Sequence, residues 1–299
     1  MGINTSVAAL LTRAREEGTS FAATATIGRQ SLTVPNAELV ALARRLGVAD
    51  PDWSSFAPDG YSEDFFRLFF GAQTVTSFDA SPYQNVGVVH DFNQPLPACH
   101  HGSCDAVFDG GSMEHIFDVR QVLSNYMLLP KVGGSVFIST TANNLCGHGF
   151  YQFSVEFFYR VFCAANGYEI EKVCLIETPF HGVERSGQQK VYLAADPPTV
   201  GKRTVIVTDK PVSIYVHARR VADVPLFATP PHQSDYASRW DTFAADAGTA
   251  DGKPSEAEAP ARDAAGFTYI SAWDAWWRSR LQRRKNSLRN RKWFTPLVP

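Results

Sequence analysis

Acidic residues follow several short apolar segments in the middle of the 299-residue chain. Asp79 ends TVTSFD, Asp91 follows GVVH, and Asp109 ends CDAVFD. The carboxyl ends of parallel strands lie along one edge of a sheet, where a carboxylate can accept hydrogen bonds from the hydroxyls of a ribose. The spacing therefore predicts a nucleotide-type site at that edge. The alternative is a turn former or helix cap at Asp79 and an Asx turn at Asp91.

A second polar group lies in DGGSMEHIFD, directly after the third of these segments. Gly110 and Gly111 lack a Cβ, so a ligand can approach the main chain closely there. Ser112, Glu114 and His115 would line or support the same pocket. The alternative is that Glu114 and His115 open a helix, whose positive end favours the carboxylate.

The loop NNLCGHGFYQFS is unusually polar and aromatic, and it places His148 between two glycines. A neutral histidine has a pKa close to physiological pH, so it can take a proton from a hydroxyl or an amine. We therefore predict His148 as a general base, with His115 as the competing candidate. A single histidine in a loop can equally serve as a structural hydrogen-bonding residue.

The elements that would position these residues alternate between strand and helix. Apolar strands over 21–28, 74–79, near Val88, 106–109 and 135–140 alternate with segments of helical spacing. YEIEKVCLIE and QQKVYLAA follow as two β segments without a helix between them. This order predicts a Rossmann-like α/β fold. We expect a mostly parallel sheet with helices on both faces and an antiparallel terminal β pair.

The chain divides by composition into four parts. Residues 1–197 form the predicted α/β domain, 198–244 an appended segment of strands or a lid, 245–265 a disordered linker rich in Ala, Gly, Pro and acids, and 266–299 a basic aromatic helix or tail. Eight Arg or Lys and no acid occur between Arg278 and Lys292. An anionic partner is one interpretation of this segment. We favour the other, a solvated helix that packs on the domain through Trp273, Trp276 and Trp277.

Overall composition excludes several classes of protein. The net charge of −2 gives no general attraction to nucleic acid or membrane, and no run of eighteen apolar residues forms a transmembrane segment, so we expect a cytoplasmic protein. Five cysteines without a CxxC pair indicate neither a disulfide framework nor a zinc site, and CHHGSC matches no familiar ligand set. We predict no metal, and the oligomeric state stays open.

From about residue 23 to 195, the order and wording of these segments resemble the class I S-adenosylmethionine-dependent methyltransferases. The resemblance implies that Asp79 binds the ribose, that Asp91 meets the adenine amino group while Phe92 covers the ring, and that Asp109, Gly110, Gly111 and Glu114 surround the methionine part. It further implies methyl transfer to oxygen, or to nitrogen, of a small polar acceptor, for which we suggest a sugar or sugar-containing precursor. The acceptor side would comprise His148, Asn143, Asn144, Tyr151 and Gln152.

One segment departs from the family pattern. Where family members usually have a GxGxG turn after the first strand, this chain has ATIGRQSLTV, with Gly28 alone. Arg29 can replace the missing backbone contacts by binding a carboxylate in bidentate fashion. The alternatives are a non-catalytic binding or scaffold protein that kept the fold, and an enzyme that uses the pocket for another nucleotide.

Overall fold

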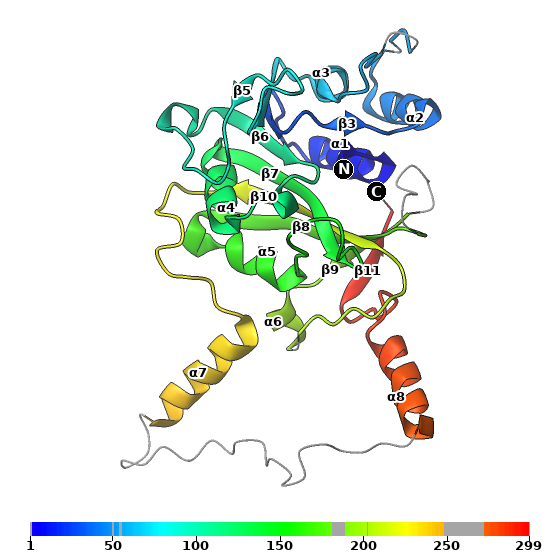
Figure 1. The fold of residues 1–299 in the computed structure, drawn as a ribbon, viewed down its shortest axis with the longest axis vertical. Coiled ribbons are helices and arrows are strands. Elements are labelled where there is room, and N and C mark those ends of the chain that lie inside the picture. Colours follow the sequence, from blue (N-terminus) through cyan, green and yellow to red (C-terminus); the bar gives the residue numbers. More distant parts are fainter. Residues whose placement is uncertain are drawn as a thin grey trace.

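The computed structural model describes residues 2–49, 51–53, 56–180, 189–201, 203–247 and 272–298 (Figure 1). Within these residues, nine strands form one sheet in the order β11-β9-β8-β10-β7-β6-β2-β4-β5, and β1 pairs with β3 separately. The strands are β1 Gly2–Ile3, β2 Ala23–Ile27, β3 Ser31–Leu32, β4 Thr74–Asp79, β5 Val88–Val89, β6 Cys104–Asp109, β7 Pro130–Asn143, β8 Tyr168–Glu177, β9 Lys190–Ala194, β10 Val212–Arg220 and β11 Phe294–Leu297. The helices are α1 Thr5–Glu16, α2 Asn36–Leu46, α3 Glu63–Phe70, α4 Val119–Leu128, α5 Val155–Val161, α6 Pro197–Val200, α7 Ser234–Ala247 and α8 Ala272–Lys285.

The first half of the sheet is doubly wound. Strands β5, β4, β2, β6 and β7 lie side by side and are all parallel, which is the order 3-2-1-4-5 of their sequence. This confirms the predicted α/β class with a parallel core. The strand order reverses between β2 and β6, and ligands of such sheets bind in the crevice at that switch point, beyond the carboxyl ends of the strands.

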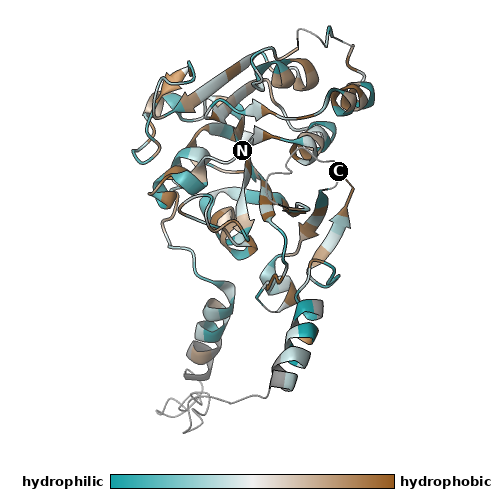
Figure 2. Ribbon diagram, turned by 45° about the vertical axis from the view of Figure 1, so that its right-hand side comes forward, coloured by the Kyte–Doolittle hydropathy of each residue, from teal (hydrophilic) through white to brown (hydrophobic). Residues whose placement is uncertain are grey.

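Helices cover both faces of the sheet. Because side chains alternate along a strand, Val107 of β6 joins the apolar cluster under α4 and α5, whereas its neighbour Phe108 joins the cluster under α1, α2 and α3. All four phenylalanines of α3 are buried in the second cluster, as their spacing predicts. In Figure 2 the strands carry hydrophobic brown stretches beside pale and teal ones, while α8 is teal to pale where it is coloured.

The segment predicted as an appendage contributes a central strand. β10 lies between β7 and β8 and is antiparallel to both, so the expected β8–β9 pair is present but the sheet continues past residue 197. Nearly every residue of β10 is buried, including the polar side chains of His217 and Arg220. Residues 212–220 belong to the sheet rather than to an appended lid.

The basic C-terminal segment is anchored by other residues than predicted. Trp273, Trp276 and Trp277 on α8 are exposed, so the expected packing of these rings on the domain is wrong. Both α7 and α8 project away from the sheet (Figure 1). The anchor is the following turn with Trp293, and β11, which pairs antiparallel with β9.

Two sequence-based expectations concern parts of the chain beyond this core. Of the predicted linker, residues 248–265 lie outside the described residues, and 245–247 end helix α7. A bilayer-crossing helix must be long and continuously apolar, and none of the helices in the described ranges meets both conditions.

We expect stability to fall in mild acid because of His217. Its ring stacks on Phe137 with centroids 4.3 Å apart, and burial lowers its pKa to about 4 from the usual 6.5. The folded state therefore resists protonation, and stability that is complete above pH 6.5 is lost as the pH falls toward 4. The loss between pH 7 and pH 5 is about 2 kcal/mol, measurable by urea unfolding at both values. His217→Gln should remove this part of the pH dependence, and an unchanged slope in that variant would contradict the assignment.

Candidate functional site

Three residues from separate segments meet at the switch point of the sheet. Gly28 follows β2 in a left-handed conformation, with φ of 72°. A Cβ placed on it would lie 3.5 Å from Ser112 Oγ and 3.7 Å from Asp79 Oδ2. The structure thus brings Gly28, Asp79 and Ser112 together at the end of the sheet where the sequence predicts a nucleotide.

Asp79 is half-buried at the end of β4. Its Oδ1 accepts a hydrogen bond of 3.1 Å from the backbone N–H of Ser81, which is the turn-forming role considered as the alternative. Its Oδ2 faces Gly28. One oxygen therefore shapes the turn, while the other lies beside Gly28 and is not used by that turn.

The segment after β5 differs from expectation at the aromatic residue. Asp91 is exposed, and hydrogen bonds from the backbone and side chain of Asn93 lower its pKa. Phe92 is buried in the core against Phe78 and Tyr126, so its predicted role as the cover of an adenine ring is wrong.

His90 is a residue of this region that the sequence interpretation missed. Its Nε2 is buried and has no hydrogen-bond partner among the described residues. Its position directly after the apolar pair of β5, one residue before Asp91, was the available signal. A buried donor or acceptor without a partner is one that a ligand can satisfy.

Asp109 shapes the turn after β6 and leaves little for a cofactor. The carboxylate is fully buried, and the hydroxyl of Tyr126 donates to it at 2.9 Å. Burial and the neighbouring Glu114 raise the pKa of Asp109 to about 6. Its predicted contact with a cofactor is replaced by hydrogen bonds of 2.7 to 3.0 Å from the backbone N–H groups of Gly111, Ser112 and Met113.

The bare backbone at Gly110 is already covered by protein. A Cβ at this position would lie 2.4 Å from Gln30 Oε1 and 3.2 Å from the Cα of Gly2. Gln30 is buried, and its side-chain amide donates to the carbonyl of Ile27. The space that we expected the methionine part of a cofactor to fill at Gly110 is therefore occupied by Gln30.

Arg29 is likewise committed to protein contacts. Its guanidinium forms ion pairs of 2.6 Å with both Glu63 and Asp59, and it lies 3.9 Å from the centroid of the Tyr61 ring. These partners fix the guanidinium on α3 and the turn before it. The predicted bidentate grip on a cofactor carboxylate is not available in this arrangement.

Glu114, His115 and His148 form a second polar cluster at the rim of the sheet, the edge at which the parallel strands end. Glu114 lies in the 3-10 turn Met113–His115 and is fully buried, which raises the pKa of its carboxyl. Its Oε2 accepts a hydrogen bond of 2.7 Å from Thr140 Oγ1. Its Oε1 lies 3.7 Å from His148 Nε2, and the His148 and His115 rings are 5.2 Å apart. The two histidines predicted as rival bases are thus neighbours, and burial lowers the pKa of His115.

The four residues predicted for the acceptor side divide into two pairs. Asn143 and Gln152 line one cavity of about 220 Å³, together with Thr204 and other residues. Asn144 instead holds the 208–210 segment through hydrogen bonds to two carbonyls, and the Tyr151 hydroxyl donates to the carbonyl of Phe117. Gln152 also fixes its loop, since its Oε1 accepts a hydrogen bond of 3.0 Å from the backbone N–H of Leu145, so Asn143 and the amide nitrogen of Gln152 are the groups that can face a ligand.

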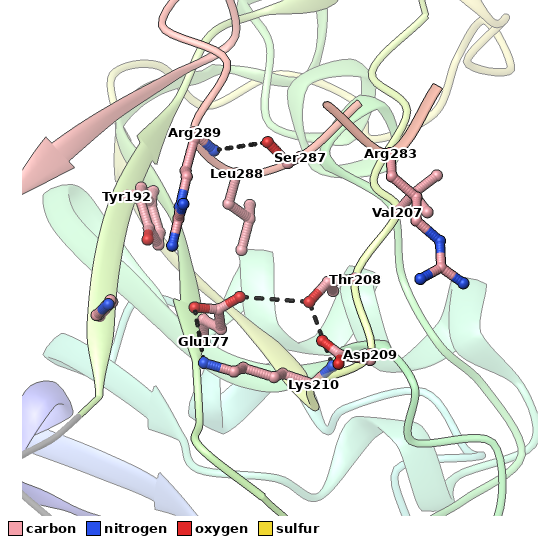
Figure 3. Close-up of a pocket in the computed structure, with 11 residues that line it drawn as sticks. Glu177, Tyr192, Val207, Thr208, Asp209, Lys210, Arg283, Ser287, Leu288 and Arg289 are labelled. Atoms are coloured by element: carbon pink, nitrogen blue, oxygen red, sulfur yellow. Dashed lines mark hydrogen bonds and ion pairs between the residues drawn. The ribbon is translucent and has the colours of Figure 1, made fainter. Parts of the chain in front are cut away.

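A larger polar cavity of about 460 Å³ lies farther along the same rim (Figure 3). Glu177 at the end of β8 lines it, bound to Thr208 and paired with Lys210. The basic C-terminal segment contributes Arg283 and Arg289 to the wall. This cavity was not predicted, because its lining comes from segments more than one hundred residues apart in sequence.

Comparison with known proteins yields structural matches only. No family model matches the chain, and no curated protein matches it in sequence. A branched-chain polyamine synthase mutein from Thermus thermophilus matches with 15% identity and a TM-score of 0.36, over 74% of this chain and 57% of that one. A putative methyltransferase from Bacillus halodurans matches with 12% identity and a TM-score of 0.41, over 73% and 100%.

The methyltransferase CalH, solved with SAH, matches with 12% identity and a TM-score of 0.38, over 72% of this chain and 55% of that one. The chain thus spans less than two thirds of the length of the polyamine synthases and of CalH. An activity for this chain therefore depends on the residues at the carboxyl ends of its own strands.

Proposed function

We propose that this chain is an S-adenosylmethionine-dependent methyltransferase that acts on an oxygen, or less readily a nitrogen, of a small polar acceptor. The carrying observation is a set of buried polar atoms along one rim of the sheet that have no hydrogen-bond partner among the described residues. These atoms are Gln30 Oε1, His90 Nε2, Glu114 Oε1 and His148 Nε2. Other such atoms lie elsewhere in the described residues, but these four follow four strands of the parallel half of the sheet, at the edge where ligands of such sheets bind, so a ligand that satisfies them supports the proposal.

The residues fit an adenosine at one end of this rim. Asp79 Oδ2 faces the crevice and can accept from a ribose hydroxyl, and the unpaired His90 Nε2 can meet a ring nitrogen or amino group of adenine. Asp91 is exposed next to it and can accept a hydrogen bond as well. These three side chains would hold the nucleoside.

The acceptor would lie toward Glu114 and His148. When bound, S-adenosylmethionine supplies a methyl group on a sulfonium, so the protein's own task is to align the acceptor and remove its proton. His148 Nε2 lies 3.7 Å from Glu114 Oε1, and its imidazole would serve as the general base, with His115 beside it. A hydroxylated acceptor such as a sugar would find amide partners at Asn143 and Gln152.

The methionine end fits less well, and this leads to a prediction about Gln30. Its side chain has to leave Gly110 and give up its hydrogen bond to Ile27, which costs about 1 kcal/mol. Gln30→Gly should therefore bind S-adenosylmethionine and S-adenosylhomocysteine about fivefold to tenfold more tightly in calorimetric titration. Adenosine is the matched control, since it lacks the methionine part and its affinity should not change. Weaker binding in the variant would mean that Gln30 contacts the ligand.

The same titrations test the function itself. Saturable binding of S-adenosylmethionine by the unmodified chain supports the proposal, whereas no binding at millimolar concentration contradicts it. The position of Gln30 beside Gly110 also favours a second candidate function, that of an enzyme for a nucleotide without a methionine part. Binding of adenosine or its phosphates, together with no response to S-adenosylmethionine in either protein, would select that candidate. Binding without turnover on a broad panel of acceptors would select the scaffold protein.

A further inference from the structure

The environment of Glu114 is unusual for a buried carboxylate. Thr140 satisfies Oε2, but Oε1 is buried with no hydrogen-bond partner in the described part of the chain. His148 Nε2 lies 3.7 Å from it, which is too long for a hydrogen bond, and this nitrogen is itself unpartnered among the described residues. Two polar atoms therefore face each other across a gap that neither of them closes.

The gap has the dimensions of a metal site. Two ligands that each lie about 2.1 Å from a tetrahedral ion are about 3.4 Å apart, close to the separation of Glu114 Oε1 and His148 Nε2. His115 supplies a third ligand atom, and all three atoms lie within 4.8 Å of one another. One carboxylate and two imidazoles on one side of an ion is a common ligand set for zinc and for non-haem iron.

The loop that carries His148 is fixed directly on Glu114. The backbone N–H of Phe150 donates to the Glu114 carbonyl at 2.7 Å. Gly149 packs so closely that a Cβ on it would lie 2.7 Å from the same oxygen. Two segments from different strand ends are thereby held in register, so the three ligand atoms are brought together by the main chain and not by flexible side chains alone.

We propose that Glu114, His115 and His148 bind one divalent transition-metal ion, such as Zn²⁺, Fe²⁺ or Mn²⁺. Imidazole ligands favour these ions over Mg²⁺ and Ca²⁺, which prefer oxygen. Three protein ligands leave at least one open coordination position for a water or for an oxygen of the substrate. The sequence did not predict this site, because its ligands come from two loops and follow no local spacing pattern.

The role of the ion in catalysis rests on the proposed methyl transfer, but its binding does not. A hydroxyl bound at the open position would lose its proton more easily, since a divalent ion stabilises the oxyanion. An oxygen acceptor would then be activated by the ion, with His148 as its ligand. With the ion bound, His148 would be a ligand in place of the general base proposed above, and the proton of the hydroxyl would pass to solvent.

The test is metal binding by the full chain without any nucleotide. After dialysis against a chelator, titration with Co²⁺ should give visible d–d absorption that saturates at one ion per chain, and Zn²⁺ should displace it. Glu114→Gln and His148→Ala should each weaken Zn²⁺ binding by at least about 100-fold, because even indirect support of a ligand is worth 10- to 100-fold. Zn²⁺ should also raise the melting temperature of the unmodified protein and not that of the variants.

Two controls make the outcome decisive. Cys146→Ser removes an exposed thiol from the same loop, and His232→Ala removes a histidine whose ring packs on Trp240; both should bind as the unmodified protein does. Circular dichroism without metal should show that Glu114→Gln is folded, since it keeps the shape of the side chain. Absence of saturable binding, undiminished binding in His148→Ala, or loss of binding in Cys146→Ser would each overturn the proposal. Because no S-adenosylmethionine is present, these results are independent of the test of the methyltransferase function.

Discussion

Asp79→Ala is expected to weaken the binding of S-adenosylmethionine and S-adenosylhomocysteine by about 100-fold. A hydrogen bond to a charged group contributes about 1.5 to 3 kcal/mol, and in the proposed site the Asp79 carboxylate accepts such a bond from the ribose. Its Oδ2 faces the crevice at Gly28, while Oδ1 keeps the turn at Ser81. Calorimetric titration of both ligands gives the change directly.

The matched control for this prediction is Asp91→Ala. Asp91 also lies in the proposed nucleoside region, but it is exposed, and its Oδ1 already accepts hydrogen bonds from Asn93. Its removal should therefore weaken binding about tenfold or less. The affinity of Asp79→Asn should fall between those of Asp79→Ala and Asp91→Ala, because the amide keeps one acceptor oxygen. Equal affinity of the unmodified chain and Asp79→Ala would remove this aspartate from the site.

Phe66→Ala is expected to lower the free energy of unfolding by about 3 to 5 kcal/mol, the cost of emptying a phenylalanine site in a packed core. Phe66 is fully buried on α3, and its ring lies 5.9 Å from Phe108 on β6 and 6.3 Å from Phe21. The residue therefore joins the helical layer to the sheet directly behind the rim. Urea unfolding monitored by circular dichroism measures the loss.

An exposed phenylalanine provides the comparison for Phe66. Phe180 is 62% exposed, so Phe180→Ala should change the free energy of unfolding by less than about 0.5 kcal/mol. If the free energy of unfolding changed as little in Phe66→Ala, α3 would be able to separate from the sheet while the sheet stays folded. The expected contrast between the two variants therefore also tests the packing of α3.

The parallel half of the fold was predictable because its rules are local. Strands such as TVTSFD and CDAVFD are short, apolar and followed by polar turns, and right-handed crossovers leave few ways to join them. The position of β10 was not predictable in this way. Its pairing with β7 and β8 depends on partners 35 to 84 residues away in sequence, and nothing within VSIYVHARR specifies an interior place.

The sequence predicted the edge of the sheet at which the site residues lie, but not the role of each residue. Asp79 and Asp109 look alike in sequence, since each ends an apolar strand. Burial separates them: Asp109 is enclosed and accepts three backbone N–H groups, whereas Asp79 keeps one oxygen directed outward. The occupation of Gly110 by Gln30 is a tertiary contact across eighty positions, which no local pattern encodes.

The interior position of β10 has a consequence for biosynthesis. β8 has no sheet partner on its inner side until β10 arrives, because β10 carries the ladders to both β7 and β8. During translation the two halves of the sheet therefore emerge as separate pieces, and they can be joined only after residue 220 has left the ribosome. The exposed edges of β7 and β8 in that interval are where a chaperone or a wrong strand would bind the nascent chain.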